Sequence, residues 1–101
     1  MKLFIDTSKT EEIVVGLDGK RFKTASKKEK SQRLLSFIDE ILTKNKTSID
    51  QIKEIKVNTG PGSFTGLRVG ISVANTIGWA KGIPVNGKNI AQDGPVVPVY
   101  E

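Results

Sequence analysis

The stretch TGPGSFTGLRVG, residues 59–70, is the part of the sequence best suited to bind a small anion. Glycines at this density leave backbone amides open and let another backbone approach closely. Ser63 and Thr65 add hydroxyl groups, and Arg68 adds a positive charge. Where a strand gives way to a helix, free amides and the helix dipole favour a negatively charged group. The stretch is therefore either a phosphate cradle or a structural corner that lets a helix pack closely.

The spacing of the glycines does not match the established phosphate-binding or nucleophile motifs. No lysine follows the last glycine, as a Walker A loop requires, and three residues rather than two separate Gly62 from Gly66. The residues around Ser63 do not have the order of a nucleophile elbow. The spacing favours the structural corner and leaves Gly62, Ser63 and Thr65 as a candidate anion-binding set.

Several kinds of chemistry are excluded by residue types that the sequence lacks. It contains no histidine and no cysteine, which excludes a Ser-His-Asp triad, a zinc site and a disulfide. We therefore expect no catalytic residue, no metal and no cofactor. No apolar run approaches the roughly 20 residues of a membrane-spanning helix, and the opening MKLFIDTS is too polar for a signal peptide. These features predict a cytoplasmic protein that does not enter a membrane.

Positive charge is concentrated in one part of the chain. The basic residues of this run are Lys20, Arg21, Lys23, Lys27, Lys28, Lys30 and Arg33, opposed only by Glu29. Such a run can bind nucleic acid or an acidic protein, although most runs of this kind are only a solvated surface. Phe22 is the one aromatic residue among them, so a base-stacking platform is not expected.

The order of predicted elements indicates a single α/β domain of 101 residues. Strands are expected at 2–6, 12–19, 20–25, 54–60 and 83–85, and helices at 26–44 and 64–81. Asp18-Gly19 predicts a tight hairpin, and Ser26 with Glu29 matches a helix capping box. Residues 86–94 should form a loop and 95–100 an edge strand or extended arm, because two prolines interrupt this apolar tail. The order is β-β-β-α-β-α-β.

The second predicted helix has an unusual composition. Gly66, Gly70, Ala74 and Gly78 recur every four residues and form a stripe of small side chains. Each glycine costs a helix up to about 1 kcal/mol relative to alanine, so the stripe needs a packing reason. The other positions are mostly apolar, which is typical of a helix buried on two sides. One side should meet the sheet and the other a second neighbour, but the sequence does not decide which side carries the stripe.

Three segments resemble the TsaB family, also called YeaZ. They are KLFIDTS (2–8), EKSQRLL (29–35) and GPGSFTGLRVGISVANTIGWAKGIPV (60–85). The resemblance implies an actin-like (ASKHA, ribonuclease H-like) fold with a mixed five-stranded sheet and two main helices. Family members are longer and have a second domain, so the chain is expected to represent a truncated N-terminal domain. Its core would be residues 1–85, and residues 86–101 would form the loop and tail.

The resemblance also implies a function and partners. TsaB proteins are non-catalytic accessory proteins in the synthesis of N6-threonylcarbamoyladenosine in tRNA. They bind the catalytic paralogue TsaD through a bundle of helices and form homodimers through the same surface when TsaD is absent. A partner on this surface would be the second neighbour of the helix at 64–81. Contact with tRNA would be indirect or weak.

The resemblance and the helix periodicity together give a set of candidate interface residues. These are Gln32, Leu35 and Asp39 on the first helix and Phe64, Leu67, Arg68, Gly70, Ile71 and Ala74 on the second. On the first helix, Leu34, Ile38 and Ile41 are left to face the sheet. The competing interpretation is that all the apolar members of the set are ordinary core residues.

Two other functions remain open from the sequence. The segment Asp6-Thr7-Ser8 resembles a phosphate-binding turn of the actin-like superfamily, so Asp6 and Thr7 join the candidate anion-binding set. A minimal nucleotide-binding or phosphotransfer unit would use these residues, although a single carboxylate without a histidine offers little for general acid–base catalysis. A direct tRNA-binding module would use the basic run, and its affinity would fall steeply with salt.

Overall fold

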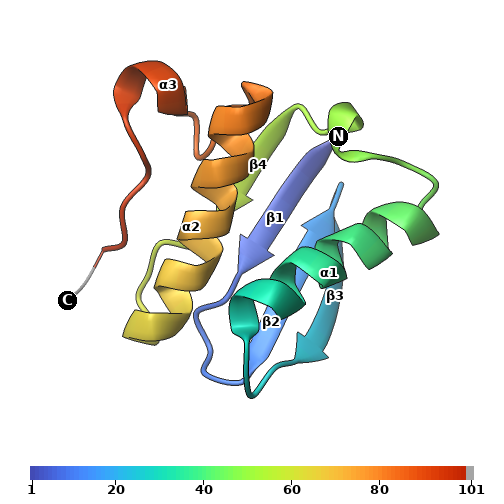
Figure 1. Cartoon of the computed structure of the whole chain (residues 1–101), viewed down its shortest axis with the longest axis vertical. Coiled ribbons are helices and arrows are strands. Elements are labelled where there is room, and N and C mark those ends of the chain that lie inside the picture. Colours follow the sequence, from blue (N-terminus) through green and yellow to red (C-terminus); the bar gives the residue numbers. More distant parts are fainter. Residues whose placement is uncertain (100–101) are drawn as a thin grey trace.

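The computed structural model describes residues 1–99 and shows a mixed four-stranded sheet (Figure 1). The strands are β1 (Lys2–Asp6), β2 (Glu12–Leu17), β3 (Lys20–Ala25) and β4 (Glu54–Val57). The helices are α1 (Lys30–Lys44), α2 (Phe64–Lys81) and α3 (Ile90–Asp93), with a short 3₁₀ helix at Ile49–Gln51. The sheet order is β3-β2-β1-β4, in which β4 runs parallel to β1 and the other pairs are antiparallel. The predicted α/β class and mixed sheet are confirmed.

The fifth predicted strand, at 83–85, is wrong. The segment meets the edge of β4 through one isolated bridge between Val85 and Ile55, in which the Ile55 N–H donates to the Pro84 carbonyl and the Asn86 N–H donates to the Ile55 carbonyl, both at 2.9 Å. The next residue, Asn86, then turns its side chain onto Val57: its Oδ1 accepts from the Val57 N–H at 2.9 Å, and its Nδ2 donates to the Val57 carbonyl at 3.0 Å. Asn86 has a φ of 50°, so the backbone leaves the sheet while its amide continues the hydrogen-bonding pattern.

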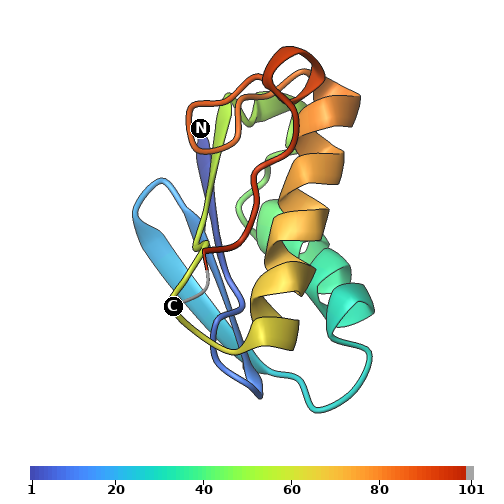
Figure 2. The same cartoon turned by 90° about the vertical axis from the view of Figure 1, so that its left-hand side faces the viewer.

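Both long helices pack on the same face of the sheet (Figure 2). Alternate strand residues point to this face and are buried, which follows the two-residue period of a strand with one covered side. The strand residues in this core are Leu3, Ile5, Ile13, Val15, Leu17, Ile55 and Val57. Among residues 1–99 no helix covers the opposite face, where the Arg21 guanidinium lies 4.2 Å from the centre of the Phe4 ring.

Helix α1 begins later than the capping-box pattern predicts. The residue at its N-cap is Glu29, which has a left-handed φ of 52° and makes no side-chain cap. Ser26 is buried outside the helix, where its N–H donates to the Glu11 carbonyl and its hydroxyl donates to the Lys28 carbonyl. The predicted capping box therefore does not form, and Ser26 instead holds the loop before α1 against the loop that follows β1.

The small-residue stripe of α2 faces the sheet. A Cβ added to Gly70 would lie 2.5 Å from the Thr7 hydroxyl oxygen, and one added to Gly78 would lie 2.5 Å from a Val85 methyl group. Ala74 is fully buried. The helix ends as predicted at Gly82, whose φ of 66° suits glycine. The stripe thus exists to bring α2 close to its own sheet.

Besides the sheet, α2 also packs against the C-terminal segment of the chain. Part of the predicted loop 86–94 forms α3, and the extended tail then runs back beside α2 (Figure 2). The Asn75 side chain donates to the Val96 carbonyl and accepts from the Val96 N–H, both at 2.9 Å. The Val99 N–H donates to the Thr59 carbonyl at 2.7 Å. Over residues 95–99 the apolar tail is therefore an extended arm and not an edge strand, and residues 100–101 lie outside the described part of the chain.

Candidate functional site

Thr7 joins the end of β1 to α2. Its side chain is almost fully buried, donates a hydrogen bond to the Gly66 carbonyl and accepts one from the Gly70 N–H at 3.0 Å. These two backbone groups are one helical turn apart, so the hydroxyl is fixed between them. Because both its donor and its acceptor are engaged, the Thr7 hydroxyl has no role left in binding an anion.

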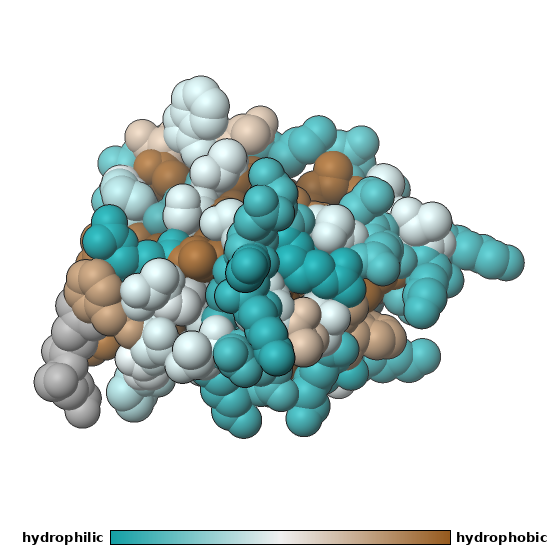
Figure 3. Space-filling model, turned by 60° about the horizontal axis from the view of Figure 1, so that its bottom comes forward, coloured by the Kyte–Doolittle hydropathy of each residue, from teal (hydrophilic) through white to brown (hydrophobic). Residues whose placement is uncertain are grey.

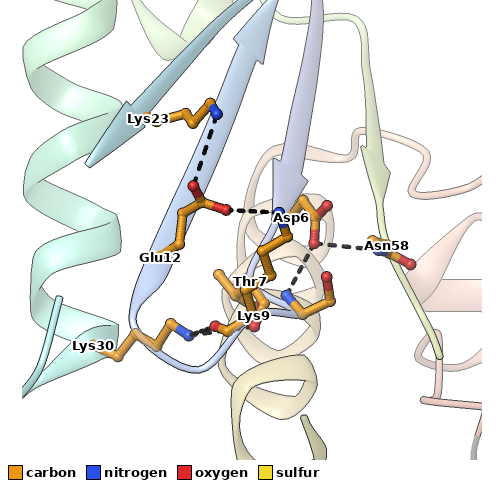
Figure 4. Close-up of polar contacts among 8 residues, drawn as sticks. Asp6, Thr7, Lys9, Glu12, Lys23, Lys30 and Asn58 are labelled. Carbon is orange, nitrogen blue, oxygen red and sulfur yellow. Dashed lines mark hydrogen bonds and ion pairs between the residues drawn. The ribbon is translucent and has the colours of Figure 1, made fainter. Parts of the chain in front are cut away.

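Asp6 is held at the same strand end by two donors. One of its carboxylate oxygens accepts from the Ser8 N–H at 2.9 Å and from the Asn58 side-chain amide at 3.2 Å (Figure 4). Partial burial acts to raise the pKa of this carboxyl, but the hydrogen bonds from Ser8 and Asn58 and the charge of Arg21 lower it, and the net result is a pKa below 3.8. Asp6 is therefore ionised at neutral pH and serves to order the loop after β1.

This shift predicts an acid dependence of stability. Since the pKa of Asp6 is lower in the folded state, its contribution to the unfolding free energy is present above the ordinary value of 3.8 and is lost as the pH falls through the folded-state pKa. Urea unfolding between about pH 6 and pH 2 should therefore show a smaller loss of stability in Asp6→Asn than in the wild type. Parallel pH profiles for the two proteins would contradict this.

The glycine loop before α2 is packed against the loop after β1. A Cβ on Gly62 would lie 2.6 Å from the Ser8 Cβ, and the Ser63 N–H donates to the Ser8 carbonyl at 2.8 Å. The Ser63 hydroxyl caps α2 by accepting from the Gly66 N–H, whereas Thr65 is exposed. The structure brings Asp6, Thr7, Gly62 and Ser63 together, but the Asp6 carboxylate binds Ser8 and Asn58, and the Thr7 and Ser63 hydroxyls bind the backbone of α2. The loop is built as a structural corner.

Lys30 completes this junction through contacts that lie 20 or more residues away in the sequence, so no local pattern predicts them. Its ammonium group donates to the carbonyls of Thr7 and Lys9 (Figure 4) and also to the carbonyl of Thr10. Burial lowers the pKa of Lys30, although the charges of Asp6 and Glu12 act in the opposite direction. Lys30 therefore ties the first turn of α1 to the loop after β1.

Within residues 1–99, no group of three or more acidic, histidine or cysteine side chains is placed to hold a metal ion. None of the helices in this part of the chain is long and apolar enough to cross a membrane.

The predicted interface residues of α1 lie on its outer side. Gln32, Leu35 and Asp39 are exposed, and 53% of the Leu35 surface is open to solvent. The residues left for the sheet, Leu34, Ile38 and Ile41, are all buried in the core. The two faces of α1 are therefore separated as the helical period predicts.

The prediction for α2 needs a correction. Leu67, Gly70, Ile71 and Ala74 are buried inside the chain, because this side of α2 carries the small-residue stripe that packs on the sheet. They cannot form an external interface in the folded chain. Phe64 and Arg68 are exposed, and the Arg68 guanidinium lies 5.5 Å from the centre of the Phe64 ring.

The exposed candidates form one outer surface, which we call the α1–α2 face. Its residues are Gln32, Leu35 and Asp39 on α1 and Phe64 and Arg68 on α2. Beside them is an open hollow of about 370 Å³, lined by Ser31, Thr65, Val69 and Ser72 as well as Phe64 and Arg68. The α1–α2 face combines two large exposed apolar side chains with polar neighbours, a composition that suits contact with another protein.

Comparison with known proteins identifies the family. A family model described as TsaD, tRNA N6-adenosine threonylcarbamoyltransferase, matches residues 23–90. The chain belongs to this family. The match includes α1, α2 and the glycine loop, which are the elements that build the α1–α2 face.

Curated relatives in this group are named TsaB, which confirms the resemblance seen in the sequence. The chain is 38% identical over 60 residues to the tRNA threonylcarbamoyladenosine biosynthesis protein TsaB of Escherichia coli, covering 59% of this chain and 26% of that protein. It is 36% identical over 87 residues to TsaB of Haemophilus influenzae, covering 82% of this chain and 36% of that protein. The chain thus spans well under half the length of these relatives.

A solved structure supports the same assignment at the level of the fold. YeaZ from Pseudomonas aeruginosa superposes with a TM-score of 0.70 at 26% identity, over 83% of this chain and 41% of that one. The fold is therefore the YeaZ-like, actin-like fold, here with four strands rather than the five expected.

Proposed function

We propose that this TsaD-family chain is a non-catalytic protein-binding module of tRNA threonylcarbamoyladenosine biosynthesis in the cytoplasm. It docks on a TsaD-type protein through the α1–α2 face, and two copies pair through the same face when that partner is absent. The relatives named TsaB support the process, and the family model supports the class of partner. The chain supplies the docking module, and the partner supplies the transferase.

The observation that carries this proposal is the exposure of Leu35 and Phe64. Both side chains are more than half exposed, at 53% and 55%. The other large apolar side chains of α1 and α2 are buried or half-buried, except Trp79 near the end of α2, which is 67% exposed. Large apolar side chains in the centre of an interface usually provide most of its binding energy. A partner helix laid along the α1–α2 face would cover both of them.

A non-catalytic role is favoured over the nucleotide-binding alternative. The sequence has no histidine or cysteine, and the hydroxyl of Thr7 and the carboxylate of Asp6 are already engaged within the chain. We expect a calorimetric titration with ATP and magnesium to give no binding heat at millimolar nucleotide. Saturable binding at micromolar nucleotide would instead favour the minimal nucleotide-binding domain.

The docking surface is tested by Leu35→Lys. Because Leu35 is exposed, the variant should keep the wild-type unfolding temperature while it loses affinity for the TsaD-type protein at least tenfold, which is about 1.4 kcal/mol or more. Val97→Lys is the matched control, since Val97 is also exposed, at 63%, but lies on the C-terminal arm. Calorimetric titration of the partner with each variant makes the measurement. Equal loss for both variants, or no loss for Leu35→Lys, would contradict the proposal.

A further inference from the structure

We propose that a basic groove at the start of α1 binds the phosphate backbone of RNA. The groove consists of two adjoining hollows of about 440 and 480 Å³. They share Ser26, Lys27, Lys28, Glu29 and Gln32. The first hollow extends to the first turn of α2, and the second extends along α1 to Ser36. The groove shares Gln32 with the α1–α2 face, and it shares Ser31, Thr65 and Val69 with the hollow beside that face.

The lining of the groove is strongly positive. Lys27, Lys28, Lys30 and Arg33 line it, and Glu29 is its one acidic residue. The charges of Lys30 and Arg33 are held in place by three loop carbonyls and by Glu40, respectively. Lys27 and Lys28 are exposed and make no side-chain hydrogen bond or ion pair within residues 1–99. Both ammonium groups are therefore free to contact an anion.

The loop that carries these two lysines is fixed by its neighbours. Ser26 is buried and hydrogen-bonded on both sides of the loop, to Glu11 and to Lys28, and the Glu29 carbonyl accepts from the Arg33 N–H at 3.0 Å. An ordered loop has less conformational entropy to lose on binding. Viewed from this end, the middle of the molecule's surface is hydrophilic, and the hydrophobic residues visible on it lie in small separate areas (Figure 3).

The composition of the groove favours RNA over an acidic protein. Thr10, Ser31, Ser36 and Thr65 line it with hydroxyl groups, which commonly bind phosphate oxygens. No aromatic side chain lines either hollow, and Val69 is their one large aliphatic residue. Protein interfaces are enriched in aromatic residues at their centre, whereas nucleic-acid interfaces are more polar and more positive. Without an aromatic side chain to stack on a base, the groove should not select a sequence.

The experiment compares Lys27→Ala/Lys28→Ala with the control Lys53→Ala/Lys56→Ala, which removes the same charge from exposed lysines in and next to β4. The probe is an unmodified, fluorescently labelled tRNA transcript, titrated with the full chain at several salt concentrations. Each phosphate contact contributes about 0.7–0.9 to the slope of log affinity against log salt. We therefore expect the groove variant to lower this slope by about 1.4–1.8, and the control to lower it much less.

The inference depends on the proposed function only for the choice of tRNA as the probe. An equal change of the salt slope in both variants would mean a diffuse attraction to net charge and would contradict the proposed groove. No binding of tRNA by the wild type would contradict it as well. Tighter binding of a poly-glutamate peptide than of tRNA would identify an acidic protein as the occupant. None of these results involves the TsaD-type partner, so a failure here is distinguishable from a failure of the docking proposal.

Discussion

Gly70→Leu is expected to destabilise the domain by about 3 kcal/mol or more, at the upper end of what overpacking costs. A Cβ at this position would already lie 2.5 Å from the Thr7 hydroxyl oxygen and 3.2 Å from an Ile5 methyl group, and leucine adds three further carbons. The better helix propensity of leucine returns at most about 1 kcal/mol. Because small domains are stable by only about 5–15 kcal/mol, urea unfolding should show a large shift of the midpoint.

The control is Ala80→Leu, an exposed position near the end of the same helix. It should change the unfolding free energy by no more than about 0.5 kcal/mol, as is usual for surface substitutions. The comparison also separates the two roles that a small-residue stripe can have. If Gly70→Leu left stability unchanged and abolished association, the stripe would lie in an interface and its packing on the sheet would be contradicted.

Thr7→Val should cost about 1–3 kcal/mol, because it keeps the shape of the side chain but removes the hydroxyl that bonds the Gly66 carbonyl and the Gly70 N–H. Both backbone groups are buried with this residue, so no solvent replaces the lost partner. Thr7→Ser is the matched control, since it keeps the hydroxyl and loses only a methyl group. The unfolding free energies of the two variants in urea give the answer.

If Thr7→Val and Thr7→Ser lowered stability equally, the methyl contact rather than the hydrogen bonds would explain the effect. If Thr7→Val had wild-type stability, the hydroxyl would be available for another purpose, and an anion-binding role for the strand end would regain support. Inorganic phosphate, added to the wild type, is expected to leave the unfolding midpoint unchanged.

Most of the fold could be predicted because its signals are local. The apolar run in 2–6, the alternation in 20–25, the Asp18-Gly19 turn and the bounds of α2 are set by neighbouring residues, and the structure has them as expected. The fifth strand failed for a reason that lies elsewhere in the chain. The Asn86 amide takes up the Val57 backbone groups that this segment would have bonded if it had continued as a strand past Val85.

The candidate site was less predictable because its contacts are far apart in sequence. Thr7 meets α2 across 59 residues, and no periodic pattern marks that contact. The stripe of α2 is visible in the sequence, but its apolar neighbours surround the helix, so the side that meets the sheet cannot be deduced from the period. Likewise, nothing local shows that Asn75 binds the backbone of Val96 and brings the C-terminal arm against α2.

The central claim is that the α1–α2 face binds a TsaD-type protein, and the most direct measurement is the solution mass by light scattering. The chain is measured alone and then mixed with a TsaD-type protein from the same genome. We expect a dimer alone that exchanges into a mixed complex containing one or more copies of each protein. A chain that stays monomeric and leaves the mass of the TsaD-type protein unchanged would contradict the account.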